Sequence, residues 1–293
     1  MTFLKNMNWN LADNLFEFDR EDSKGQQIFR RIFELFIVLA TINLAWYWGE
    51  YTLRISDIVL PLGLARYIDI SFMHGNQLPI WNAGAITGLV AIGFFRLGRW
   101  PYALAFVLLV LQYSARFTLG EIPHSSNLVG MGLLGFALGR LCFPDETSQG
   151  RFSIGFSYFF IGLGYTSAAI SKLIATGITW PSGKHLWMWI NEKAVDEIAR
   201  SGFVELNIVQ EAAMASFIVA TLFLAFGLIA EALAWLVWYK KTRMLLMLGI
   251  LALHIGIWMT MDILFALSVY ELLILTFPWA VWIDRFLDKR GST

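Results

Sequence analysis

Residues 243–283 read RMLLMLGILALHIGIWMTMDILFALSVYELLILTFPWAVWI, a run that stays apolar for 41 residues. One helix over this run would be about 60 Å long at 1.5 Å per residue, roughly twice the hydrocarbon core of a bilayer. We therefore divide the run into two membrane passes near Asp262. The same length criterion predicts six further passes, at 28–49, 80–97, 101–118, 126–143, 152–176 and 212–238.

The composition of the whole chain supports this interpretation. Of its 293 residues, 57% are hydrophobic and 15% are charged, which is far more apolar than a soluble domain of this length. The expected fold class is all-α: a polytopic integral membrane helix bundle of about eight transmembrane helices with additional interfacial helices. We expect an N-terminal segment at 1–27, a transmembrane domain at 28–283 and a tail at 284–293.

Positive charges give an independent indication of topology, because Lys and Arg accumulate on cytoplasmic loops. With the N-terminus inside, 15 of the 22 Lys and Arg residues fall on inner segments and 6 on outer ones. We therefore expect both termini in the cytoplasm and the lipid bilayer as a partner. The formal net charge is zero and no basic block stands out, so nucleic acid is not an expected partner.

Two longer connections, 50–79 and 177–211, face outward in this topology. The first has apolar residues at helical spacing between Ile55 and Ile68, which predicts a helix lying in the interface, with a kink at Pro61.

The second connection opens with Trp180, Trp187 and Trp189, whose rings favour the headgroup level, and continues through polar residues to Glu205. This pattern predicts an interfacial belt followed by a surface helix.

Ionisable residues within the predicted passes are costly in a membrane and therefore informative. Besides the arginines already counted with the inner segments, seven are present: Glu34, Arg116, Lys172, Glu231, His254, Asp262 and Glu271. Glu34, Arg116 and Asp262 lie near the ends of passes, where we expect them to reach the interface by snorkelling.

Lys172, Glu231 and His254 are the stronger functional candidates. Lys172 is interpreted either as a snorkelling interfacial lysine or as an amine in an apolar setting that can act as a base near neutral pH. His254 is interpreted either as a core histidine hydrogen-bonded within the bundle or as a proton-handling group.

Other sequence features argue against metal, disulfide or dinucleotide chemistry. The four histidines are scattered without ligand spacing, and Cys142 is the single cysteine, so no metal site or internal disulfide is expected. Residues 130–135 match a G-x-G-x-x-G spacing but lie inside an apolar pass, and the glycines continue to Gly139. Close helix packing through Gly135 and Gly139 is the expected role.

Two motifs carry a family resemblance. Six residues separate Tyr165 from Lys172-Leu173, and Trp180-Pro181-Ser182-Gly183 follows them. Glu231 then begins a segment that leads to Lys240-Lys241-Thr242-Arg243 and to Leu253-His254-Ile255-Gly256. In order and spacing these motifs resemble the HTTM family, the membrane domain of vitamin K-dependent gamma-carboxylase and its bacterial relatives, over about residues 28–283.

The predicted topology puts Lys172 at the extracytoplasmic end of its pass, and the resemblance implies a catalytic site there. There Lys172 would deprotonate a reduced, vitamin K-like quinone, and oxygen would convert the quinol to an epoxide through a strongly basic intermediate. That intermediate would abstract a glutamate proton of a peptide substrate so that carbon dioxide can add. His254 and Glu231 would handle protons, Tyr165 and Trp180 would line the cofactor site, and the membrane would be the inner membrane of a bacterium.

Some positions depart from the carboxylase pattern. Its Asn-His pair falls on Ser126-Asn127, with His124 nearby, and Ala169 replaces a usual glycine. Because the chain ends at Thr293, we expect no large extracytoplasmic domain. Two functions therefore stay open: a quinol-dependent oxygenase or carboxylase-like enzyme, and a non-catalytic membrane subunit or maturation factor in which other membrane subunits are partners and Lys172 pairs with an acid or a carbonyl.

Overall fold

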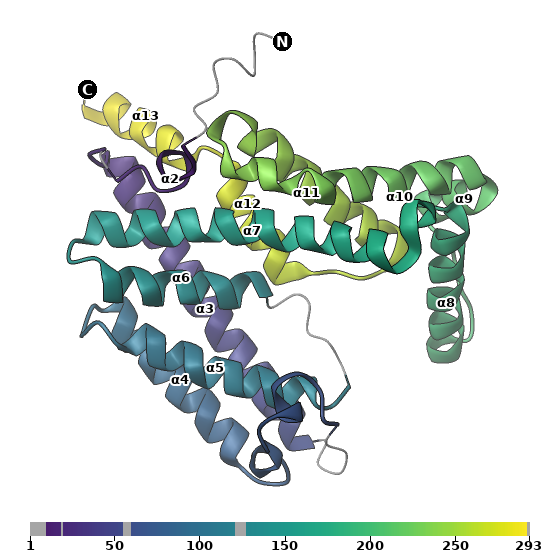
Figure 1. Cartoon of the computed structure of the whole chain (residues 1–293), viewed down its shortest axis with the longest axis horizontal. Coiled ribbons are helices and arrows are strands. Elements are labelled where there is room, and N and C mark those ends of the chain that lie inside the picture. Colours follow the sequence, from purple (N-terminus) through teal and green to yellow (C-terminus); the bar gives the residue numbers. More distant parts are fainter. Residues whose placement is uncertain (1–9, 19, 55–59, 121–126, 292–293) are drawn as a thin grey trace. The chain divides into compact units, whose positions relative to one another are not determined.

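The computed structural model describes residues 10–18, 20–54, 60–120 and 127–291. Within them the chain forms twelve α-helices and no strand (Figure 1), which confirms the predicted all-α class. The α-helices are α2 (Leu11–Leu15), α3 (Lys24–Arg54), α4 (Leu78–Phe94), α5 (Pro101–Phe117), α6 (Asn127–Cys142), α7 (Glu146–Thr176), α8 (Gly183–Ser201), α9 (Ile208–Ala215), α10 (Phe217–Ala232), α11 (Lys240–Met261), α12 (Ala266–Thr276) and α13 (Trp279–Gly291). Short 3-10 helices are η1 (Gly63–Arg66), η2 (Ser71–Met73), η4 (Gly177–Thr179) and η5 (Ala234–Trp238).

The chain divides into two compact units, one of which consists of Leu15–Ser157 and Phe277–Thr293. In this unit α3 packs against α4, α5, α6 and α13. Proline lies in the first turn of both α4 and α5, at Pro79 and Pro101, where its missing N–H breaks no helical hydrogen bond. A Cβ at Gly25 would lie 2.1 Å from the Ala280 carbonyl oxygen, so α3 and α13 can approach this closely only because residue 25 is glycine.

Glycines also bring α6 against the first part of α7 in this unit. A Cβ at Gly139 would lie 2.8 Å from the carbonyl oxygen of Gln149, and one at Gly135 would lie 3.1 Å from the Phe156 ring. The close packing predicted for this glycine pair is confirmed.

Two charged residues of this unit, Glu34 and Arg116, are buried, at 4% and 1% exposed. Their predicted approach to the interface therefore does not bring them to the surface of the protein. Glu34 accepts hydrogen bonds from Tyr102 and Arg140 at 2.8 and 2.9 Å, and the Arg116 guanidinium lies 3.5 Å from the centroid of the Tyr51 ring. Partners within the protein take the place of solvent for both charges.

The second unit consists of Met1–Asn14 and Tyr158–Thr276. In it α10 packs against α8, α9 and α11. A small core forms where α8 meets α9 and α10, from the buried side chains of Leu186, Ile190, Ala213 and Ala220.

The segment 212–238, predicted as one pass, is broken in this unit. Ser216 adopts an extended conformation, with φ −143° and ψ 119°, and caps the next helix by accepting from the Val219 N–H. As a result the chain bends by 114° between α9 and α10. After α10 the chain forms the 3-10 helix η5, which ends at Trp238. A serine competes with the helix for backbone hydrogen bonds and so favours such a cap.

The break predicted near Asp262 in the long apolar run is confirmed as a break between two helices, α11 and α12. Asp262 ends α11 in the left-handed conformation, with φ 52°, and its N–H donates to the Trp258 carbonyl. Asp is among the few residues other than glycine that tolerate this conformation.

The two long connections gave different outcomes. Of the helix predicted around Pro61, residues 55–59 lie outside the described part of the chain, and the following residues form η1 and η2 rather than an α-helix. The helix predicted in the second connection is confirmed as α8, although it starts earlier and includes Trp187 and Trp189.

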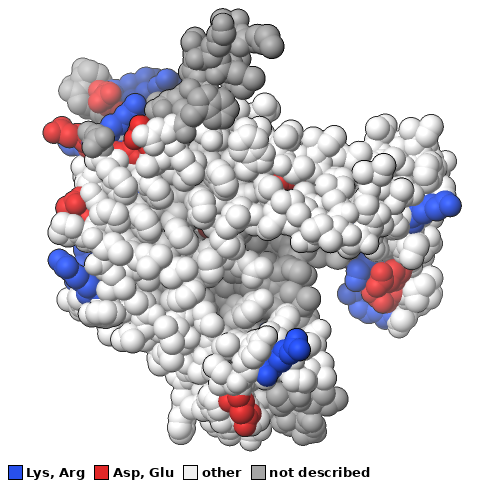
Figure 2. Space-filling model, viewed as in Figure 1, with Lys and Arg blue, Asp and Glu red and all other residues white. Residues whose placement is uncertain are grey.

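Among the described residues, two helices are long and apolar enough to cross a membrane, Glu146–Thr179 and Lys240–Met261. The number rises to four if each of two bent pairs, α9 with α10 and α12 with α13, forms one span. Three shorter helices, α4, α5 and α6, are also apolar. Most of the face shown in Figure 2 carries no charged side chain.

Gly162 offers a test of the packing inside the second unit. Its Cβ would lie 2.2 Å from Trp238 Nε1, which donates to the Phe159 carbonyl at 3.0 Å. We expect Gly162→Ala to lower the free energy of unfolding by about 1–3 kcal/mol, because the indole must move. In the control Gly164→Ala, the nearest atom is 3.9 Å away, so this variant should be neutral or more stable by up to about 1 kcal/mol. Equal midpoints of thermal unfolding in detergent for the two variants would contradict this packing.

Candidate functional site

Lys172 on α7 and Glu231 on α10 form an ion pair. Lys172 Nζ lies 2.5 Å from both carboxylate oxygens of Glu231. The side chain of Glu231 is 7% exposed and that of Lys172 is 29% exposed. An unpaired charge in so apolar a setting is costly, so each of these groups stabilises the other in place.

The turn after α7 adds an aromatic ring to the pair. Gly177 takes the left-handed conformation, with φ 72°, and the Trp180 N–H donates to its carbonyl at 3.2 Å. This turn holds the Trp180 ring with its centroid 4.7 Å from Lys172 Nζ. The ammonium group therefore has a carboxylate partner and a cation–π partner.

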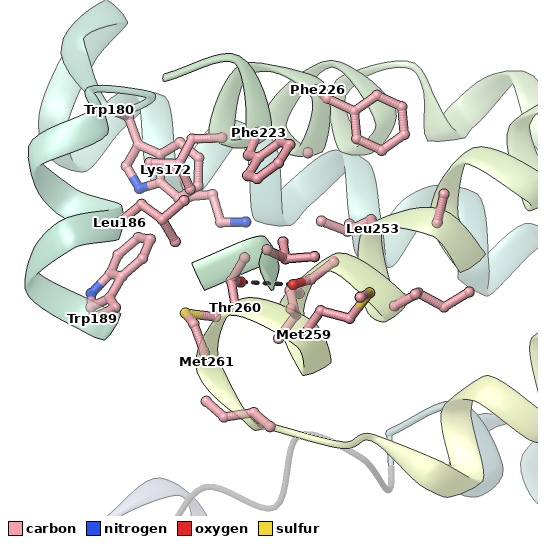
Figure 3. A pocket seen from close by; sticks show the side chains of 18 residues that line it. Lys172, Trp180, Leu186, Trp189, Phe223, Phe226, Leu253, Met259, Thr260 and Met261 are labelled. Carbon is pink, nitrogen blue, oxygen red and sulfur yellow. Dashed lines mark hydrogen bonds between the residues drawn. The ribbon is translucent and has the colours of Figure 1, made fainter. Parts of the chain in front are cut away.

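An apolar cavity of about 830 Å³ lies beside Lys172. Within the described part of the chain, Lys172 is the single charged residue that lines it, and Figure 3 shows its amine pointing in among the apolar side chains. The rest of the wall comes mainly from α8, α10 and α11, including Leu186, Trp189, Phe223, Phe226, Leu253 and Met259. The site thus combines a large, mainly apolar volume with one charged group, which is a usual pattern for a small-molecule site.

Glycine on α11 keeps part of this cavity open. Gly256 lines the cavity, and a Cβ built there would meet no atom within 4 Å. Sequence analysis noted Gly256 only as part of the motif around His254. Whether Gly256 faces the cavity depends on the rotation of α11 about its axis, and the sequence motif does not specify this rotation.

Tyr165 and His254 hydrogen-bond each other, through the Tyr165 hydroxyl and His254 Nε2. Their rings meet edge to face with centroids 5.7 Å apart, and the Phe265 ring also meets the imidazole edge to face, with centroids 5.4 Å apart. Neither residue is among those that line the cavity. The hydrogen-bonded core histidine, one of the two interpretations of His254, corresponds to this arrangement.

The structure thus brings together Lys172, Glu231 and Trp180, and forms a separate pair from Tyr165 and His254. Only Lys172 and Trp180 of these five face the cavity.

Glu271 on α12 is a buried acid to which sequence analysis gave no role. It is 1% exposed, and its Oε2 has no hydrogen-bond partner among the described residues. Tyr165 lies within electrostatic range of both Glu231 and Glu271. The surroundings of the Tyr165 hydroxyl therefore include these two carboxyl groups as well as the His254 imidazole.

Two other expectations concern residues near α6 and metal ligands. Of the positions that depart from the carboxylase pattern, His124 and Ser126 lie outside the described residues, and Asn127 begins α6. Within the described residues, no three His, Cys, Asp or Glu side chains gather as metal ligands.

No family model, no curated protein and no solved structure matches this chain. Functional assignment therefore depends on the geometry of the cavity and of the Lys172–Glu231 pair.

The ion pair predicts a characteristic pattern of stabilities. We expect Lys172→Met to lower the free energy of unfolding by about 3 kcal/mol, since it leaves the Glu231 carboxylate buried and unpaired. The double variant Lys172→Met/Glu231→Met should recover most of this loss, because it removes both charges. Thermal unfolding in detergent would measure both effects.

Lys193→Met is the matched control, because Lys193 pairs with Asp196 at 3.2 Å on an exposed surface. It should change stability by no more than about 0.5 kcal/mol. A double variant at positions 172 and 231 that is as unstable as the sum of its single changes would show that the pair contributes no coupling.

Proposed function

We propose that this protein is a polytopic membrane protein whose cavity binds an apolar small molecule with a polar head, of the reduced-quinone class. The observation that supports it best is the cavity of about 830 Å³ with an apolar wall and one inward-pointing amine, that of Lys172. Eight membrane passes with both termini in the cytoplasm remain part of this proposal. The helices near every predicted pass and the bias of positive charges support it.

The residues of the cavity suit a quinone-type molecule. Phe223, Leu253 and Trp189 offer apolar and aromatic surface to a ring and its lipid tail. Lys172 Nζ can donate a hydrogen bond to a ring oxygen. When bound, a reduced quinone would supply two electrons and two ionisable hydroxyl groups.

The Lys172–Glu231 pair can move a proton at this wall. If the proton passes from Lys172 Nζ to a Glu231 oxygen, one N–H bond breaks and one O–H bond forms, and both groups become neutral. An apolar environment favours the neutral pair relative to water. The neutral amine can then accept a proton from an acidic hydroxyl in the cavity, so Lys172 would act as a general base. Glu231 would hold the proton that Lys172 has given up.

A non-catalytic subunit or maturation factor is the second candidate, and one observation favours it. Lys172 is already paired with an acid, as that interpretation expects, and a paired ammonium that keeps its proton is a structural group. Membership of the HTTM family is compatible with both candidates. It remains a proposal, supported by the Tyr165, Lys172, Trp180, Glu231 and His254 motifs.

Filling the cavity tests the binding step without touching the ion pair. In Gly256→Leu the new side chain would extend into open space, so we expect the protein to fold while losing at least about tenfold in affinity for a quinone. Quenching of tryptophan fluorescence by added ubiquinone would report binding, because Trp180 and Trp189 line the cavity.

Gly130→Leu on α6 is the control for this experiment, since a Cβ at Gly130 also meets no atom within 4 Å and Gly130 does not line the cavity. Unchanged quenching in Gly256→Leu would show that the quinone does not bind in this cavity.

Lys172→Arg separates the two candidate functions. Arginine can keep the ion pair with Glu231, but its guanidinium does not give up a proton in proteins. An enzyme that uses Lys172 as a base should fold, bind quinone and lose oxygen uptake with a reduced quinone by at least about a hundredfold. Wild-type oxygen uptake in this variant would reject the role of Lys172 as base. If the wild type itself shows no oxygen uptake, the subunit function would be favoured.

A further inference from the structure

Four arginines meet at one end of the unit formed by Leu15–Ser157 and Phe277–Thr293. Arg30 and Arg31 lie near the start of α3, Arg96 follows α4, and Arg140 lies near the end of α6. Together they line a cavity of about 520 Å³. This cavity is lined by residues of α3, of α6 and of the first turns of α7, together with Arg96 after α4, and it shares no lining residue with the cavity beside Lys172.

Acidic side chains do not neutralise this cluster. Glu34 pairs with Arg31 and Arg140 at 2.6 and 2.9 Å, and Glu146 pairs with Arg96. Asp22 pairs with Arg30 and also with Arg151, at 2.6 Å for the latter. Among the described residues, three carboxylates therefore serve five guanidinium groups, which leaves two positive charges in excess within this part of the chain.

The arginines are held in place by the surrounding structure. Arg140 also donates to the Gly93 carbonyl at 3.0 Å, and Arg30 donates to the Thr147 carbonyl at 3.0 Å. The aliphatic part of the Arg30 side chain packs against Gly150, where a Cβ would lie 2.5 Å from the Arg30 Cδ. Fixed guanidinium groups lose little conformational entropy when they bind an anion.

Arg96 occupies a backbone position that favours glycine. The Arg96 N–H donates to the Gly93 carbonyl and the Leu97 N–H to the Ile92 carbonyl, which is the Schellman ending of a helix. Its residue in the left-handed conformation is usually glycine, but here it is Arg96, with φ 62°. The ion pair of Arg96 offsets little of that strain, because its partner Glu146 has a side chain that is 66% exposed. Strain of this kind is often retained where a side chain has a function.

We propose that this cavity binds a phosphate-type anion, and that the anion is the headgroup of an anionic phospholipid. Guanidinium groups match phosphate oxygens in geometry and in charge. The predicted topology puts all four arginines on the cytoplasmic side, and basic pockets between membrane helices on that side suit such headgroups. Arg96 follows the apolar helix α4 and Arg140 lies near the end of the apolar helix α6, so in the predicted topology the cavity would lie at headgroup depth.

Arg96→Gly is the sharpest test, because a structural role and a binding role predict opposite results. Glycine relieves the left-handed strain, so the delipidated variant should be as stable as wild type or more stable. The same variant should bind phosphatidylglycerol about tenfold more weakly, since it loses a charge-assisted contact. Arg99→Gly is the matched control: Arg99 is exposed in the same connection and does not line the cavity.

Full-length protein would be delipidated in detergent and titrated with phosphatidylglycerol, phosphatidylcholine or inorganic phosphate. Thermal midpoints and native mass spectra would be recorded. We expect phosphatidylglycerol to bind and stabilise the wild type and Arg99→Gly, and to do so more weakly for Arg96→Gly, with no effect of phosphatidylcholine. An equal effect of inorganic phosphate at the same concentration would support the anion site but reject the lipid as its source. Identical titrations for Arg96→Gly and wild type, or no response to either anion, would overturn the proposal.

Discussion

A charged group inside an apolar helix bundle must find a partner within the protein, and the Lys172–Glu231 pair meets this requirement for the candidate site. Because Lys172 lies on α7 and Glu231 on α10, the pair fixes these two helices against each other. It also fixes the direction of the amine, which points into a cavity with an otherwise apolar wall. The contact that stabilises the fold therefore also fixes the position of the Lys172 ammonium group, the single charged group that a bound molecule would meet.

The same requirement explains the other unit. Glu34 is buried, and Tyr102, Arg31 and Arg140 surround its carboxylate. Among the described residues of this cluster, guanidinium groups outnumber carboxylates. The cluster therefore differs from the Lys172–Glu231 pair in having a net positive charge. One unit thus presents a nearly neutral apolar cavity with a single ion pair, and the other presents a polar cavity with excess positive charge. The two cavities suit different ligands: an apolar molecule with a polar head, and a phosphate-type anion.

Sequence reasoning predicted the features that depend on local pattern. Hydrophobic runs gave the helices, and length gave the division at Asp262. Lys172 and Glu231 were both identified as costly charges, but their contact joins residues 59 positions apart, and hydrophobic pattern does not specify which helices meet. The break at Ser216 depends on one serine capping a helix inside an apolar run. The burial of Glu34 and the open space at Gly256 depend on the rotation of helices about their axes, which a weak amphipathic pattern leaves undetermined.

The central claim is that the cavity beside Lys172 holds an apolar molecule with a polar head. Native mass spectrometry of protein extracted gently from its own membrane tests this claim most directly, because a ligand taken up in the cell would be retained. The account predicts one quinone-class molecule per chain in the wild type, and its loss when the cavity is filled at Gly256. A protein that carries no small apolar molecule but retains a stoichiometric protein partner would contradict the account and favour a subunit in which Lys172 has a purely structural role.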